Sequence, residues 1–199
     1  MNTQWEEDVI GEVISAGTHE ITGQAWRDKA IPPFGSFVCM GRDASVAGVV
    51  CHVENTGLDP YRRPMALERR ENEIAQAYPH LPSLLRFQFQ ALLIGRFEGA
   101  AFRFGVPGLP PPLHAEIRIC PEAQVREIRR DLGFFRLLVD SGNPSVEELI
   151  HHTCLRILEV HGWRTDEAIR LGKALAEHYR DDYDTLRRLL TRMETWLNA

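Results

Sequence analysis

The sequence Leu-Pro-Pro-Pro-Leu-His-Ala-Glu-Ile, residues 109–117, separates two interpretations of the first part of this chain. Three consecutive prolines can form a polyproline ligand for an SH3-type groove, but such ligands are exposed, disordered and usually flanked by a basic residue. Here the nearest basic residue on the N-terminal side is Arg103, and apolar and polar residues alternate directly after the prolines. Because proline is tolerated at the start of a strand, we interpret the stretch as the stiff entry into a β-strand.

The upstream sequence contains further short segments with strand character, separated by turn residues. The predicted strands are Asp8–Ser15, Glu20–Arg27, Ser36–Met40, Ser45–Val53, Arg86–Gly95 and Leu113–Cys120. Ser45–Val53 is nearly all apolar, which is typical of a strand buried on both faces. In Leu113–Cys120 the apolar positions begin with Leu113 and alternate with polar ones. Six short strands with long connections predict a small closed or nearly closed β-barrel.

The pattern changes from strands to helices at Pro121. Apolar residues spaced by three and four predict one amphipathic helix over Glu122–Val139. Ser145 followed by Glu148 forms a capping-box signature for a second helix to Val160. Thr165 can cap a third helix to about Arg180, and Asp182 a fourth to Leu197. The predicted fold class is therefore α+β: a six-stranded N-terminal barrel over residues 1–120, and a helical domain of about four helices over residues 121–199. A polar helix over Ala66–Tyr78 interrupts the barrel strands.

Composition points to an ordinary globular protein, with 44% apolar and 26% charged residues among 199. The net charge is −5 and neither half is basic, which does not favour a large nucleic-acid footprint. The four cysteines lie apart in apolar segments and make no Cys-x-x-Cys pair, as expected for buried thiols in a reducing compartment. No apolar run is long enough for a membrane span, and the first residues are acidic where a signal peptide is basic. We expect a cytoplasmic protein.

The sequence contains no motif for catalysis or cofactor binding. The only Gly-Lys pair, at Gly172, lies inside a predicted helix without the glycine spacing of a phosphate-binding loop. Cys51 and His52 are strand neighbours, whose side chains point to opposite faces. We therefore expect no enzyme, no catalytic residue and no cofactor. His151 and Cys154 share one face of a predicted helix and could hold zinc with a third ligand from elsewhere; a helix histidine near solvent and a core cysteine are the alternative.

One group of residues is a candidate binding site. The loop Tyr61-Arg62-Arg63-Pro64 is bracketed by prolines, and Arg69 and Arg70 follow it. Arg62, Arg63, Arg69 and Arg70 could bind a phosphate or a partner carboxylate, because guanidinium groups form bidentate hydrogen bonds with both. A solvated charge run, partly neutralised by nearby glutamates, is the alternative.

Several motifs of residues 8–120 resemble the HAS-barrel, the small β-barrel at the N-termini of rotary ATP synthase α and β subunits and of the DNA-translocating ATPase HerA. The matching segments are Ile10-Gly11-Glu12-Val13-Ile14, Phe34-Gly35-Ser36-Phe37-Val38 and Gly48-Val49-Val50. The chain looks most like stand-alone bacterial proteins that join such a barrel to a helical tail. In that family the barrel makes contacts between ATPase subunits, and in HerA it lies near the docking surface for the nuclease NurA. This sequence departs from the ATPases in having helices where they have a nucleotide-binding domain.

The sequence thus leads to three hypotheses. The first is a non-enzymatic assembly protein whose barrel forms a homo-oligomer or docks on a partner ATPase or nuclease. The alternative is a nucleic-acid accessory protein that binds through the arginine-rich loop, with an affinity that falls steeply with salt. The third is a metal or thiol enzyme built on the helix that carries His151 and Cys154.

Overall fold

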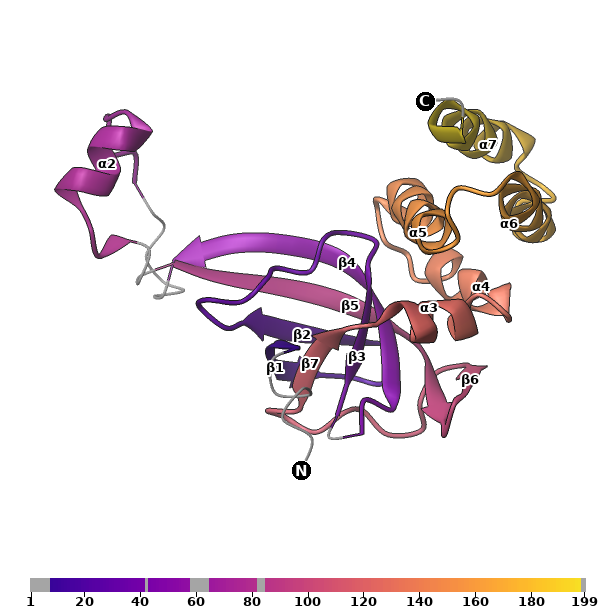
Figure 1. The fold of residues 1–199 in the computed structure, drawn as a ribbon, viewed down its shortest axis with the longest axis horizontal. Helices are drawn as coiled ribbons and strands as arrows, with labels where there is room; N and C mark the ends of the chain where they lie inside the picture. The colour runs from indigo at the N-terminus through magenta and orange to yellow at the C-terminus, as the bar shows by residue number, and fades with distance from the viewer. Residues whose placement is uncertain (1–7, 42, 58–64, 82–84, 198–199) are drawn as a thin grey trace.

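A computed structural model describes residues 8–41, 43–57, 65–81 and 85–197 (Figure 1). The strands are β1 (Val9–Ala16), β2 (Glu20–Ala25), β3 (Phe37–Met40), β4 (Val46–Gly57), β5 (Leu85–Glu98), β6 (Ala101–Phe104) and β7 (Glu116–Ile119). Six of them close into an antiparallel ring in the order β2-β1-β7-β3-β4-β5, because β5 also pairs with β2. The predicted α+β fold, a closed barrel followed by helices, is confirmed.

The barrel interior is filled by one side of each strand. The side chains that fill it include those of Val13, Val38, Met40, Phe89 and Ile117, all of them fully buried. Glycine is required on β2, because a Cβ at Gly23 would lie 2.6 Å from both the Phe89 ring and the end of Ile117. The interior is therefore a packed core without room for a channel.

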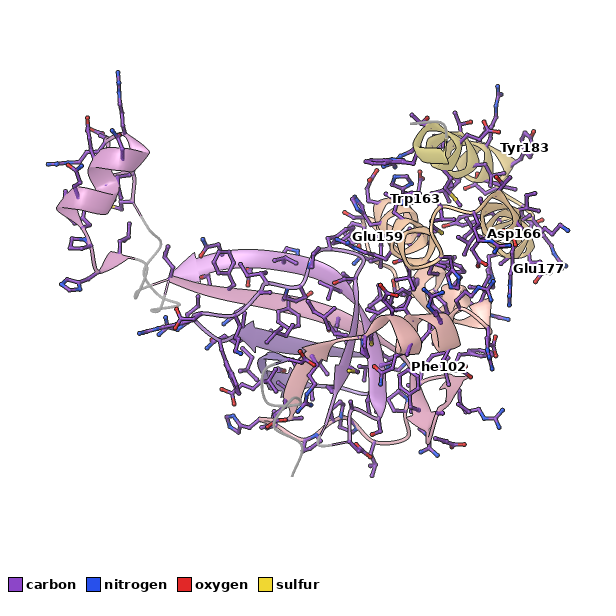
Figure 2. All side chains as sticks on the ribbon, in the orientation of Figure 1. Phe102, Glu159, Trp163, Asp166, Glu177 and Tyr183 are labelled. Carbon is purple, nitrogen blue, oxygen red and sulfur yellow. The ribbon has the colours of Figure 1, made fainter. Side chains whose placement is uncertain are left out.

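β4 is buried on both faces, as its sequence predicted. Val50 points into the barrel, whereas Ala47, Val49 and Cys51 belong to a second core outside it. β4 and β5 are longer than expected and remain paired out to Gly57 and Leu85. β6 was not predicted; it pairs with β5 and places Phe102 between β6 and α3 (Figure 2).

The C-terminal part forms α3 (Glu122–Ile128), a short 3-10 helix η2 (Leu132–Phe134), α4 (Phe135–Val139), α5 (Val146–Val160), α6 (Thr165–His178) and α7 (Tyr183–Leu197). The prediction of one continuous helix over Glu122–Val139 was wrong. The carboxylate of Asp131 accepts a hydrogen bond from the Gly133 N–H at 3.0 Å and so caps a new turn. This break turns both Phe134 and Phe135 into the core.

These helices cover the outer face of β3, β4 and β5 with one continuous apolar core. The Phe37 ring of β3 meets the Phe134 ring edge-on at 5.9 Å. Gly35, just before β3, lies so close to α5 that an added Cβ would be 2.4 Å from the Cβ of His152. The helical part therefore packs on its own barrel.

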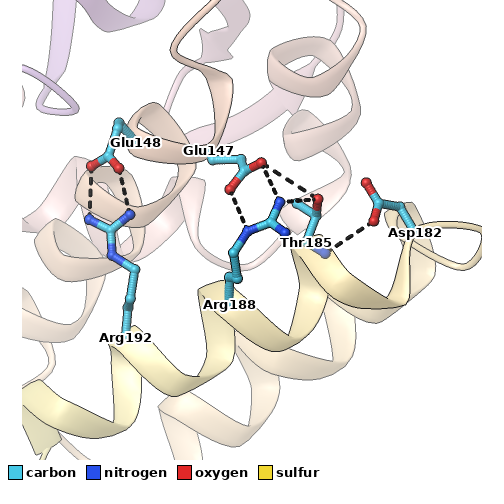
Figure 3. A network of polar contacts seen from close by, with 6 residues as sticks. All are labelled: Glu147, Glu148, Asp182, Thr185, Arg188 and Arg192. Atoms are coloured by element: carbon cyan, nitrogen blue, oxygen red, sulfur yellow. Dashed lines mark hydrogen bonds and ion pairs between the residues drawn. The ribbon is translucent and has the colours of Figure 1, made fainter.

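Arginines of α7 join it to the first turn of α5 (Figure 3). Arg192 makes a bidentate ion pair with Glu148, at 2.6 and 2.8 Å, and Arg188 donates to Glu147 at 2.8 Å. α5 starts where Ser145 predicted, but no capping box forms: the Ser145 side chain makes no capping bond, its backbone N–H donates to Asn143 Oδ1 at 2.8 Å, and the Glu148 carboxylate pairs with Arg192. Asp182 caps α7 as predicted, accepting from the Thr185 N–H at 3.0 Å.

Candidate interaction surface

The predicted arginine site is only partly visible. Arg62 and Arg63 lie outside the described residues. Arg69 and Arg70 are exposed and directly precede the short helix α2 (Glu71–Ala77), which is shorter than the predicted Ala66–Tyr78. The Arg70 backbone N–H donates to Glu73 Oε2 at 3.4 Å, so the acidic neighbour turns toward the helix start. The structure thus places Arg69 and Arg70 just before the start of α2.

Exposed apolar residues flank these two arginines in the chain, and one of them contacts Arg69. The Arg69 guanidinium lies 5.9 Å from the centre of the Tyr78 ring, which is within the range of a cation–π contact. Met65 is 86% exposed, and Leu67 and Tyr78 are also exposed. Aromatic residues, methionine and arginine are the types enriched at protein interfaces. The signal in the sequence was the apolar Met65 and Leu67 inside a charged segment.

We call residues 54–57, 65–81 and 85–88 the arm. Its base is the paired end of β4 and β5, where Asn55 faces Phe87 and Gly57 faces Leu85. Figure 1 shows α2 standing away from both the barrel and the C-terminal helices, at the far end of this hairpin. The exposed side chains of α2 are therefore displayed at a distance from the core.

A second exposed group lies on residues 105–115, which we call the proline loop. The strand predicted from Leu113 begins only at Glu116, because residues 112–115 form a turn. In it the Ala115 N–H donates to the Pro112 carbonyl at 3.1 Å, and His114 has a left-handed φ of 60°. His114 Nδ1 also lies 2.9 Å from Glu12 Oε2, which ties the loop to β1.

The proline loop presents leucines to solvent. Pro107 and Pro111 are buried and anchor it, whereas Leu109 is 81% and Leu113 60% exposed. The prediction that Leu113 begins the alternating strand was therefore wrong, because the turn places it before β7. Phe104 and Val106 at the start of the loop are exposed as well. A loop held by buried prolines loses little further entropy when a partner covers these side chains.

The remaining candidate chemistry does not assemble into a site. Burial lowers the pKa of His151 to about 4 and raises that of Cys154 well above its usual range. Across the part of the chain that the structure describes, no three His, Cys, Asp or Glu side chains are placed to share a metal ion. Cys51 is buried while His52 is exposed, and burial raises the pKa of Cys51 to about 11. His52 therefore cannot act as the base for Cys51.

Comparison with known protein families and with curated proteins finds no match to this chain. The function is therefore inferred from the fold and the surface. They define a closed barrel, covered on one side by its own helices, that exposes apolar residues on the arm and on the proline loop. In the described ranges no helix has the length and apolar character needed to cross a bilayer.

Proposed function

We propose that the protein is a non-enzymatic assembly protein whose barrel forms a homo-oligomer or docks on a partner ATPase or nuclease. The observation that carries this proposal is the exposure of Leu109 and Leu113 on a loop anchored by buried prolines. Burying a leucine against a partner contributes about 1.5–3 kcal/mol, so two such side chains can anchor an interface.

The closure of the barrel restricts how such contacts form. Each of the six ring strands is paired on both sides, so the ring offers no free edge for a strand of another molecule. β6 is different, because within the described residues β5 is its only strand partner. Contacts through loops, the arm or the outer edge of β6 are therefore favoured.

The choice of partner rests on the resemblance to the HAS-barrel, which stays a prediction. In that family the barrel contacts ATPase subunits or lies near a nuclease-docking surface. The closed six-stranded ring is compatible with it, and the proposal directs the search toward ATPases and nucleases. A cytoplasmic location likewise stays a prediction.

The experiment is native mass spectrometry of the tagged protein isolated gently from its own cells, for the wild type and for Leu109→Ser/Leu113→Ser. We expect a multiple of 22.7 kDa or a heavier species with an ATPase or nuclease, which the double variant loses while staying folded. Ile169→Ser, at an exposed site on α6, is the matched control and should keep the complex. A wild-type monomer without a bound protein would overturn the proposal.

The second candidate, a nucleic-acid accessory function, is favoured by the exposed pair Arg69 and Arg70. It predicts binding to an oligonucleotide that weakens steeply with salt and that Arg69→Glu/Arg70→Glu abolishes. Arg187→Glu makes the same charge change at one exposed site on α7, and it should then weaken oligonucleotide binding less. Equal losses in the two variants would indicate a nonspecific charge effect.

A further inference from the structure

Two cysteines lie side by side on the outer face of the barrel. Cys39 of β3 is paired across the strands with Arg118 of β7, and the Cys120 N–H donates to the Phe37 carbonyl at 2.9 Å. Cys120 is therefore two residues beyond the partner of Cys39, on the same face of the sheet. The interaction between the two thiols shifts the pKa of each, as expected for sulfur atoms that lie close together.

The same two cysteines line a cavity of about 490 Å³. Arg118 and Lys29 contribute cationic side chains to its wall, and Asp8 and Glu122 contribute carboxylates. The side-chain oxygen of Gln124, which also lines it, is buried and has no hydrogen-bond partner among the described residues. A buried, unsatisfied acceptor favours entry of a small hydrogen-bond donor such as water or a peroxide. The cavity gives such a molecule a route to thiols that are otherwise buried.

The surroundings shift the pKa values of the two thiols in opposite directions. The hydrogen bond from Cys120 and the nearby Arg118 cation lower the pKa of Cys39, against the effect of burial. Burial and the same hydrogen bond raise the pKa of Cys120. Thiolates are the reactive form of cysteine, and a nearby cation favours them; Arg118, which also pairs with Glu116, is that cation for Cys39.

We infer that Cys39 and Cys120 form a peroxide-sensitive thiol pair, with Cys39 as the reacting sulfur and Cys120 as the resolving one. The Cys39 thiolate attacks one peroxide oxygen, the O–O bond breaks, and hydroxide leaves with the other oxygen. Cys39 is then a sulfenic acid, oxidised by two electrons. The Cys120 sulfur, on losing its proton, attacks the Cys39 sulfur, so that an S–S bond forms and the hydroxyl leaves as water. In total, two thiols and one hydrogen peroxide give one disulfide and two waters.

The position of the pair gives the cross-link a structural consequence. Cys120 directly precedes Pro121, the residue that caps the start of α3. A disulfide would therefore tie β3 to the point where the chain leaves the barrel and enters the helices. The proposal is independent of the assembly function, since it needs no partner protein.

The test treats the full-length reduced protein with about one equivalent of hydrogen peroxide under native conditions and maps the products by mass spectrometry. We expect a loss of about 2 Da, the mass of two hydrogens, located between Cys39 and Cys120. Before oxidation, N-ethylmaleimide should label Cys39 at least about tenfold faster than Cys51 or Cys154, the buried cysteines with raised pKa values.

Variants separate the two steps. Cys120→Ser should stop at a sulfenic acid on Cys39 that dimedone traps, and Cys39→Ser should give neither product. Cys51→Ser and Cys154→Ser are the matched controls and should keep the cross-link. Labelling of Cys39 no faster than of Cys51 in the wild type, or no peroxide product at Cys39, would overturn the inference even if a variant failed to fold.

Discussion

The two sides of the barrel wall differ in what covers them. On β3, β4 and β5 the outward side chains, such as Phe37 and Val49, join one apolar core with the helices. On β2, and on β1 from Glu12 onward, the outward positions are half-buried or exposed, and Ile14 is 37% exposed. Packing energy is therefore concentrated on the covered side, while the uncovered side and the loops beside it are available to partners. Substitutions on the two sides should therefore have unequal effects on stability.

The largest expected loss of stability follows from removing the aromatic contact between the covered wall and η2. Phe134→Ala removes a fully buried ring that touches Phe37 and stacks on Phe135 at 4.6 Å. We expect about 3–5 kcal/mol less stability in urea unfolding followed by circular dichroism. Ile14→Ala on the uncovered wall should cost less than about 1 kcal/mol. Similar losses for the two variants would remove the distinction between the walls.

The next effect tests how closely α5 approaches the barrel. Gly35 has φ 77° and Gly142 has φ 71°, so alanine is strained at both positions by about 1–2 kcal/mol. Only at Gly35 would the new Cβ overlap α5, since at Gly142 no described atom lies within 4 Å. Gly35→Ala should therefore cost at least about 1–2 kcal/mol more than Gly142→Ala in the same unfolding measurement. Equal costs would show that the α5 contact is loose.

The covered wall was also the part that sequence reasoning predicted best. Alternation, together with the nearly all-apolar run at the start of β4, was enough to place the six ring strands, because the barrel buries one side of each strand. The break before η2 was missed because the apolar spacing continues through it; Asp131, a capping residue in mid-helix, was the available signal. β6 was missed because Ala101–Phe104 is short and lies between Gly99 and Gly105.

The candidate surface was predicted less well, for a physical reason. Alternation assigns a face to Leu113 only if the strand has begun, and the left-handed turn at His114 delays it. Nothing in the local pattern distinguishes an exposed leucine in a proline-rich loop from a buried one. Leu109 is exposed between Pro107 and Pro111, which are both buried. Arg69 and Arg70 were predicted as candidate binding residues, with a solvated charge run as the alternative, but the contact of Arg69 with the Tyr78 ring was not predicted.

A third effect concerns the pH dependence of the covered side. Burial, with the nearby Arg192 cation, lowers the pKa of His151 to about 4, whereas an unfolded histidine titrates near about 6.5. The unfolded state therefore binds a proton first, and stability present above pH 6.5 is lost as the pH falls toward 4. Between pH 7 and pH 5 we expect a loss of about 2 kcal/mol that His151→Gln abolishes. The exposed His19→Gln is the control; a slope retained in His151→Gln would contradict the assignment.

The smallest effect lies at the outer surface of the helical part, where the ion pair of Glu148 and Arg192 joins α5 to α7. Arg192 lowers the pKa of Glu148, so the pair contributes above the unfolded carboxyl pKa and is lost as the pH falls through the lowered folded value. Both side chains are at least 40% exposed, and solvent screening limits such pairs to about 0.2–1 kcal/mol. A double-mutant cycle of Glu148→Ala and Arg192→Ala at pH 7 should give a coupling in that range, reduced in 1 M salt, while a cycle with the exposed Arg187→Ala should give none. A coupling well above 1 kcal/mol would mean that this surface ion pair stabilises the protein about as much as a buried contact does. The packed region would then include α7 as well as the helices that contact the barrel.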